Sequence, residues 1–170
     1  MRGSDLVAII RAEVMLDHDA VRRIHRVAFG GETEASLVDR LRGAAGSISM
    51  VAAEAGGVVG HILFTAAKIV GKQVRVAGLG PMAVSPARQR SRIGSELVLR
   101  GLEECQRAGY DAVVVVGHPE YYPRFGFQRG GSFGLRCQFE VPDEFFMATE
   151  LRPGALSGGG QVQYAAEFSE

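Results

Sequence analysis

The chain has 170 residues, which is enough for one domain with a sizeable buried core. Its 19 basic and 19 acidic side chains cancel, which argues against nucleic acid or an anionic membrane as a partner, and no apolar run is long enough to span a bilayer. Its two cysteines, Cys105 and Cys137, form neither a metal-binding spacing nor a disulfide framework, so we expect no metal and a cytoplasmic protein.

The N-terminal part predicts one strand and two helices. Leu6 to Ile10 is a short apolar run that suits a strand. Asp17 is placed to cap a helix, whose apolar face comprises Val21, Ile24, His25 and Ala28. Thr33 is placed to cap a second helix, which carries Leu37, Val38 and Leu41. Because His25 shares an apolar helical face, we interpret it as a packed histidine.

Three strands then follow as an antiparallel meander. Met50 to Ala55 and Val58 to Thr65 flank Gly56-Gly57, which is typical of a two-residue hairpin turn. A second turn at Gly71-Lys72 leads into the apolar run from Val74 to Val84. Such short links suffice only between antiparallel neighbours.

An arginine-rich turn joins the third of these strands to a helix. Ser85 to Arg92 is polar, and from Ile93 a helical period begins. The apolar face of this helix comprises Ile93, Leu97, Val98, Leu102 and Cys105. The first turn of a helix has free backbone N–H groups and a dipole that favours negative charge. The arrangement therefore indicates a cradle for phosphate.

The helix leads into Val113 to Val116, which reads as a buried strand. A strand reached by a helical crossover lies parallel to its neighbour, here Val74 to Val84. We therefore expect an α/β fold of layered α+β type, with a mixed, mostly antiparallel sheet and helices on both faces. Later strands are predicted at Leu135 to Phe139, Phe145 to Leu151 and Gln161 to Tyr164, and the glycine run at 158–160 is a candidate for flexibility.

Two motifs in this stretch resemble those of the GNAT superfamily of N-acetyltransferases. Gln89-Arg90-Ser91-Arg92-Ile93-Gly94 is similar to the signature Gln/Arg-x-x-Gly-x-Gly/Ala, although Arg92 stands in place of the first glycine. Tyr122-Pro-Arg-Phe-Gly126-Phe127 is similar to the Tyr-x-x-x-Gly-Phe ending of that core. The match covers about residues 5–130, and residues 131–170 resemble the C-terminal β extension of the YhbS-like branch. We expect one domain over residues 1–170.

The resemblance implies that the chain binds acetyl-CoA. The implied cofactor-binding residues are Met82, Ala83, Val84, Gln89, Arg90, Ser91, Arg92, Ile93, Gly94 and Ser95. Backbone N–H groups of the turn, with Arg88, Arg90 or Arg92, would neutralise the phosphates of coenzyme A. Gly80-Pro81 interrupts the strand, because proline cannot donate a ladder hydrogen bond. A bulge there would splay the parallel pair and free Val84 to pair with pantetheine.

The resemblance also implies catalytic roles by position. The Met82 N–H would stabilise the thioester oxygen, and the Tyr122 hydroxyl would protonate the departing thiolate. Members that act on protein lysines often carry a glutamate four residues before Met82, where this chain has Gly78. The general base therefore stays open among Glu54, His61, His118 and Glu120. We favour His118, because it follows the strand that opens at the cofactor and because histidine is the side-chain type that most often serves as a general base.

Together these patterns predict acetyl transfer from acetyl-CoA to a primary amine by direct attack in a ternary complex. No Cys or Ser occupies a motif position that would serve as a nucleophile. Two alternatives stay open: a regulatory module that binds coenzyme A without turnover, and a transferase for longer acyl groups with a pocket lined by Phe and Met residues near 133–147. The acceptor, whether a small-molecule or a peptide amine, and the oligomeric state, a homodimer included, cannot be read from the sequence.

Overall fold

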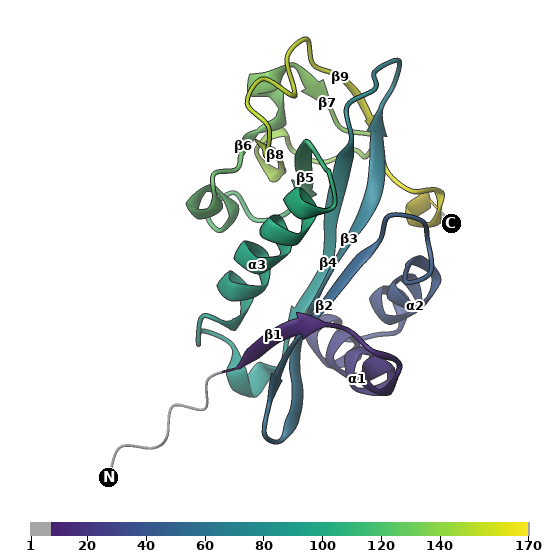
Figure 1. Ribbon diagram of the computed structural model, residues 1–170, viewed down its shortest axis with the longest axis vertical. Helices are drawn as coiled ribbons and strands as arrows, with labels where there is room; N and C mark the ends of the chain where they lie inside the picture. The colour runs from purple at the N-terminus through teal and green to yellow at the C-terminus, as the bar shows by residue number, and fades with distance from the viewer. Residues whose placement is uncertain (1–7, 170) are drawn as a thin grey trace.

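The computed structural model describes residues 8–169, in which a long mixed sheet carries helices on both faces (Figure 1). The strands are β1 (Ile9–Ala12), β2 (Ile48–Glu54), β3 (Gly57–Ile69), β4 (Val76–Val84), β5 (Ala112–Val116), β6 (Gln128–Arg129), β7 (Leu135–Arg136), β8 (Phe146–Glu150) and β9 (Gly160–Gln163). The helices are α1 (His18–Phe29), α2 (Thr33–Leu41) and α3 (Ile93–Arg107). The strand order is β1-β2-β3-β4-β5-β8-β6, and β9 pairs with β3 and β7.

The parallel pair that the sequence predicts is β4 with β5, joined through α3. Val76 to Leu79 pair with Ala112 to Val115. The other neighbours along the main strand order are antiparallel, including the predicted hairpin between β2 and β3. The predicted mixed sheet is therefore confirmed. The sequence gives no sign of a second, short parallel pair between β7 and β9.

The N-terminal caps differ from those predicted. β1 begins at Ile9, and Leu6 and Val7 of the predicted strand lie outside the described residues. The carboxylate of Asp17 does not cap α1 but accepts hydrogen bonds from Arg11 and from the backbone N–H of Val14. The charged guanidinium is a stronger partner than a helix N–H, and its hydrogen bond lowers the pKa of Asp17. Thr33 begins α2 without a side-chain cap.

Helices cover the sheet from opposite sides, with α3 on one face and α1 and α2 on the other (Figure 1). The predicted face of α3 is buried against strands β2 to β5 in a cluster that includes Ile93, Leu97, Val98, Cys105, Phe64 and Val113. On the opposite face the packed residues are Val21, Val38, Leu41, Val51 and Leu63. Burial on both faces explains the continuous apolar runs of the central strands.

His25 is a packed histidine, as predicted. Its Nε2 lies 2.8 Å from Nδ1 of His61, and Nε2 of His61 lies 2.7 Å from Oγ of Ser49. Burial lowers the pKa of His25 to about 4 and also lowers the pKa of His61, so both rings are neutral near pH 7. Ser49 donates to Glu13, which accepts two hydrogen bonds from Arg42. A polar network thus runs beneath α1.

The C-terminal segment belongs to the same sheet. β8 lies between β5 and β6, and the last described residues return as a short 3-10 helix (Ala166–Ser169) beside α2 (Figure 1). The glycine run at 158–160, predicted as a candidate for flexibility, leads into β9, which begins at Gly160, and the Gly160 N–H donates to the Gly134 carbonyl at 3.1 Å. Gly159 lies so close to the Gly134 backbone that a Cβ could not fit.

Candidate active site

The strand β4 separates from β5 at Gly80-Pro81. Leu79 pairs with Phe64 of β3 but Met82 pairs with Ile62, so β4 contains one extra residue at this point. The pairing between β4 and β5 extends only to Leu79. The predicted bulge and the predicted splay of the parallel pair are therefore confirmed.

Beyond the bulge, Met82 and Val84 turn their backbone groups away from β3. The N–H of Ser85 donates to the Val59 carbonyl at 2.7 Å, and hydrogen bonding alternates along an antiparallel strand. Met82 and Val84 therefore face the side that β5 has left. The Val84 carbonyl indeed accepts a hydrogen bond from Nε2 of Gln89 at 3.3 Å on that side. β4 presents an unpaired edge, to which an amide chain can add like a strand.

The start of α3 presents free backbone N–H groups. The first intrahelical bond runs from the Glu96 N–H to the Arg92 carbonyl, at 2.9 Å. The N–H groups of Ile93, Gly94 and Ser95 therefore have no partner within the helix. Arg92 has a φ of 68°, in the left-handed region that the motif glycine would adopt readily. The backbone of the turn therefore has the conformation of an anion-binding helix start, although Arg92 stands in place of the motif glycine.

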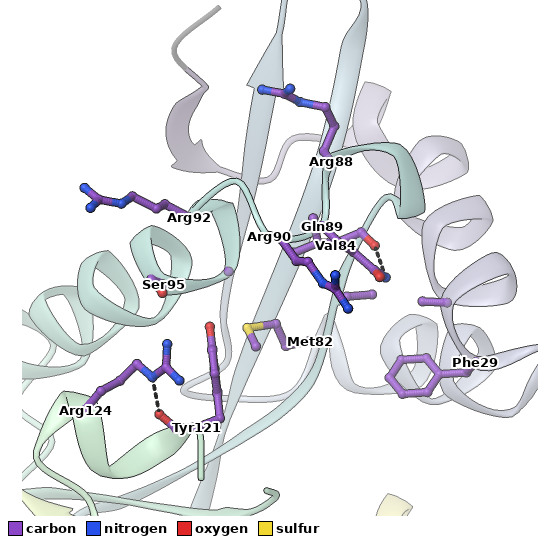
Figure 2. A pocket seen from close by; sticks show the side chains of 13 residues that line it. Phe29, Met82, Val84, Arg88, Gln89, Arg90, Arg92, Ser95, Tyr121 and Arg124 are labelled. Atoms are coloured by element: carbon purple, nitrogen blue, oxygen red, sulfur yellow. Dashed lines mark hydrogen bonds between the residues drawn. The ribbon is translucent and has the colours of Figure 1, made fainter. Parts of the chain in front are cut away.

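A pocket of about 620 Å³ lies between this turn, β4 and the end of α1. Arg90, Arg92 and Arg124 line it, and none of them pairs with a carboxylate within residues 8–169. Figure 2 shows Arg90 extending over the pocket and Arg92 extending in the opposite direction. Arg88, a predicted phosphate ligand, also lines the pocket but is paired with Glu54, with 2.6 Å between Nη2 and Oε1. Its charge is largely neutralised by that pair.

The structure brings together most of the residues predicted to bind the cofactor. Those that line the pocket are Met82, Ala83, Val84, Gln89, Arg90, Arg92, Gly94 and Ser95. Ser91 and Ile93 do not line it. The Ser91 hydroxyl donates to the Arg88 carbonyl, and the Ile93 side chain packs in the core. For these two residues, the backbone N–H groups remain the predicted contacts to the cofactor.

A second cavity, of about 960 Å³, lies where β4 and β5 diverge. It shares five lining residues with the first pocket, namely Phe29, Met82, Gln89, Arg90 and Tyr121. The end of β5 contributes Val116 and Gly117 to its wall. The unpaired edge at Met82 therefore lies where the two spaces meet.

Tyr122 and His118 line this second cavity. The Tyr122 ring lies directly against Gly117, where a Cβ would collide with it. Burial raises the pKa of Tyr122 to about 12, so its hydroxyl keeps its proton at neutral pH, as a general acid must. The His118 ring lies 6.3 Å from the ring of Phe145. The catalytic roles of Tyr122, His118 and Met82 stay predictions.

The other predicted bases lie away from this cavity. Glu54 is held in the ion pair with an arginine, and His61 is completely buried within the histidine pair. Glu120 lines a neighbouring depression instead. Glu34 of α2, which is not among the predicted bases, does line the cavity. Among the predicted bases, His118 alone lines the cavity within the described part of the chain.

Several residues that line the two spaces were not predicted from the sequence. Tyr121 lines both spaces, and its hydroxyl would lie 2.9 Å from a Cβ added to Gly94. Arg124 lies 4.7 Å over the Tyr121 ring and donates to the Tyr121 carbonyl. Tyr121 and Arg124 are three residues apart, and this spacing could have predicted that the guanidinium packs on the ring. The second cavity is also lined by the C-terminal aromatic residues Phe139, Tyr164 and Phe168.

Over residues 8–169, no helix has the length and apolarity needed to cross a membrane. The same residues contain no cluster of three or more His, Cys, Asp or Glu side chains able to hold a metal ion.

A parallel strand pair that separates beside an arginine-rich helix start is the arrangement expected of a transferase that binds acyl-CoA. Comparisons with known proteins agree. The family described as Acetyltransferase (GNAT) domain matches residues 10–130. The chain is 31% identical over 164 residues to YhbS, an uncharacterized N-acetyltransferase of Escherichia coli K12, covering 95% of this chain and 98% of that protein. It therefore belongs to the GNAT family of acetyltransferases.

Two solved structures support the same assignment. The crystal structure of Escherichia coli YhbS in complex with CoA matches with a TM-score of 0.93, at 31% identity, covering 100% of this chain and 96% of that one. A GNAT family acetyltransferase from Brucella melitensis in complex with acetyl-CoA matches with a TM-score of 0.79, at 34% identity, covering 96% of this chain and 99% of that one.

Proposed function

We propose that the chain transfers an acetyl group from acetyl-CoA to a primary amine by direct attack in a ternary complex. The observation that carries the proposal is the junction at Met82, where an arginine-lined pocket and a cavity of about 960 Å³ share an unpaired strand edge. Holding donor and acceptor together there provides the proximity that a one-step transfer needs. The CoA and acetyl-CoA complexes of its relatives support the same donor for this chain.

The first pocket fits coenzyme A in charge and in backbone geometry. The free N–H groups at the start of α3 would bind the pyrophosphate, with Arg90 and Arg124 beside it. Gly94 keeps this surface open, since a side chain there would meet Tyr121. The backbone groups of Val84 that face away from β3 would pair with the pantetheine amides, with the carbonyl exchanging its bond to Gln89 for one to the cofactor. Acetyl-CoA bound in this way supplies the activated acetyl group.

Three groups at the junction fit the transfer. The Met82 N–H would donate to the thioester oxygen, where negative charge grows under attack. His118 would take the proton that the amine loses, directly or through water, and Tyr122 would give a proton to the departing sulfur. The new C–N bond forms as the C–S bond breaks, so one proton is removed from nitrogen and one is delivered to sulfur.

Thermal denaturation with ligand and a thiol-release assay test this proposal. Coenzyme A at about 100 times its Kd should add roughly 2.7 kcal/mol to the stability, and dephospho-coenzyme A should bind less tightly if an arginine contacts the 3′-phosphate. Acetyl-CoA with a panel of primary amines should then release thiol faster than acetyl-CoA alone. Propionyl- and hexanoyl-CoA test the preference for acetyl. Binding without amine-dependent release would favour the non-catalytic module, and no binding at millimolar coenzyme A would refute the donor assignment.

A further inference from the structure

The second cavity has one carboxylate in its wall, that of Glu34 in the first turn of α2. The basic side chains that line the cavity are Arg90, shared with the first pocket, and His118. Glu34 is partly buried, and it makes no ion pair with any described residue. Its negative charge is therefore available to a bound molecule, and such a charge raises the local concentration of cations.

The other acidic side chains near the start of α2 are already neutralised. Glu32 pairs with two arginines of α1, and Asp39 pairs with Arg22 and Arg42. Three acidic residues lie between positions 32 and 39. The one that lines the cavity, Glu34, is thus the one without a basic partner in the described part of the chain.

Glu34 lies away from the junction between the two spaces. It lines the second cavity but not the first pocket, whereas Met82 lines both. Phe168 also lines the second cavity, and it packs in the same cluster as Leu37, which lies about one turn after Glu34 on α2. A carboxylate in a cavity with aromatic rings suits an ammonium group.

The charge that Glu34 binds has to persist during the reaction. The amine that attacks the thioester must first lose its proton. A carboxylate that held this amine as ammonium would stabilise the unreactive form and slow the transfer. A second ammonium group on the acceptor keeps its charge throughout. The Arg90 guanidinium, which would repel that group, is neutralised when the phosphates of coenzyme A lie beside it.

We infer that Glu34 selects acceptors that carry a second positive charge, as a diamine does, and binds this charge while the other amine reacts at Met82. The inference rests on the proposed acetyl transfer. The body of the acceptor would cross the second cavity from the junction to the start of α2. Glu34 is then a specificity-determining residue, and it lies outside the reacting atoms.

Steady-state kinetics of the full chain with acetyl-CoA and acceptors that differ only at their far end test this inference. Cadaverine, 5-aminopentanol and 5-aminopentanoate place a cation, a neutral group and an anion at the same distance from the reacting amine. We expect kcat/KM to fall in that order. The diamine should exceed the alcohol by about fivefold or more, corrected for its two equivalent amines, which is near the upper end for a partly exposed ion pair.

Two further features of the kinetics follow from the same reasoning. The preference should lie in KM rather than in kcat, because the second charge is bound equally in the ground state and in the transition state. Putrescine and hexamethylenediamine, each with its matched aminoalcohol, vary the distance between the two charges. Absence of a preference for the diamine at all three chain lengths would overturn the inference.

Glu34→Gln removes the charge and keeps the size of the side chain. It should abolish the preference for the diamine over the alcohol and reduce the discrimination against 5-aminopentanoate. Glu32→Gln is the matched control, since it removes the same charge two residues away from a side chain that lines neither space. The control should retain the preference of the wild type.

Two results with these variants would overturn the inference. An equal loss of activity towards all three acceptors in Glu34→Gln would show a structural role or a role at the reacting atoms. An equal fall of the preference in both variants would show a long-range effect of net charge, which should also weaken at high salt. Titration with coenzyme A checks that both variants are folded.

Binding measurements keep the inference separate from the proposed function. Calorimetry on the coenzyme A complex should show cadaverine binding that weakens by about fivefold or more in Glu34→Gln but not in Glu32→Gln, whether or not acetyl transfer is detected. Failure of coenzyme A to bind, or no amine-dependent thiol release with any acceptor, would refute the proposed function. Acetyl transfer without a preference for a second positive charge would refute the inference alone.

Discussion

Replacing Arg92 by glycine should stabilise the fold, because Arg92 holds a left-handed backbone conformation with a φ of 68°. For a residue with a Cβ this conformation costs roughly 1–2 kcal/mol, and glycine adopts it freely. The gain is reduced by roughly 0.5–1 kcal/mol, because glycine has more conformational freedom to lose on folding. The Arg92 side chain is exposed and makes no ion pair with a described residue, so its removal costs little.

The expected net gain is therefore about 0.5–1 kcal/mol, which for a chain of this length raises Tm by about 1–4 °C. Arg92→Ala is the matched control, since it removes the same guanidinium but keeps a Cβ in the left-handed conformation. Thermal denaturation should place the alanine variant near the wild type and the glycine variant above both. Because the Arg92 side chain points away from the pocket in Figure 2, coenzyme A affinity in the glycine variant should change by less than tenfold, or about 1.4 kcal/mol.

Two results would refute this reasoning. Equal stability of the glycine and alanine variants would show that residue 92 is not held in the left-handed conformation in solution. A gain of a hundredfold or more in coenzyme A affinity for Arg92→Gly would show that the arginine obstructs the cradle. That result would move the non-catalytic binding module ahead of the enzyme.

Three further predictions concern the site and the buried histidines. Tyr122→Phe should lower kcat by about 100-fold, near the lower end for loss of a general acid, while coenzyme A affinity measured by calorimetry stays unchanged; full kcat would remove the hydroxyl from the mechanism. Gly94→Val should weaken coenzyme A binding at least tenfold, because its Cβ meets the Tyr121 hydroxyl at 2.9 Å and its methyl groups cover the helix start; an unchanged Kd would place the phosphates elsewhere. The pKa values of His25 and His61 are depressed in the fold, so the unfolded chain binds more protons below pH 6.5 and stability should fall as pH drops from 6.5 towards the folded pKa of about 4 for His25. In this range each histidine contributes up to about 1.4 kcal/mol of unfolding free energy per pH unit. Denaturant titrations at several pH values should therefore show that the unfolding free energy of the double variant His25→Gln with His61→Gln depends less on pH.

The donor half of the site could be predicted from the sequence because its parts are local. A strand, a polar turn and a helix start follow one another between Leu79 and Ser95, and their chemistry depends on neighbours in the chain. Even so, the sequence could not show that Glu54, more than thirty residues away, pairs with Arg88. It also could not show that Asp17 is engaged by Arg11 of the preceding strand. Both depend on tertiary contacts that compete with local roles.

The wall of the second cavity could not be predicted from the sequence, because it also depends on tertiary contacts. Phe139 and Tyr164 each end a stretch that is predicted to be a strand, but nothing in the sequence shows that they meet Phe168. They do so because the C-terminal segment returns to the sheet through β8 and β9. Gly78 looked like a missing base, and its structural meaning appears only when the Tyr164 ring is seen to lie against it. The role of Gly78 depends on a ring from a distant part of the chain, so no local sequence pattern reveals it.

Phe139, Tyr164 and Phe168 lie beyond residue 130, where the match to the family ends, whereas Phe29 and Tyr122 lie within the matched region and line the same cavity. The wall of the second cavity is therefore encoded partly inside and partly outside the family region. Substitutions at the three later aromatic positions can reshape this cavity without altering any residue that lines the first pocket. Similarity over residues 10–130 alone consequently leaves part of the shape of the second cavity undetermined.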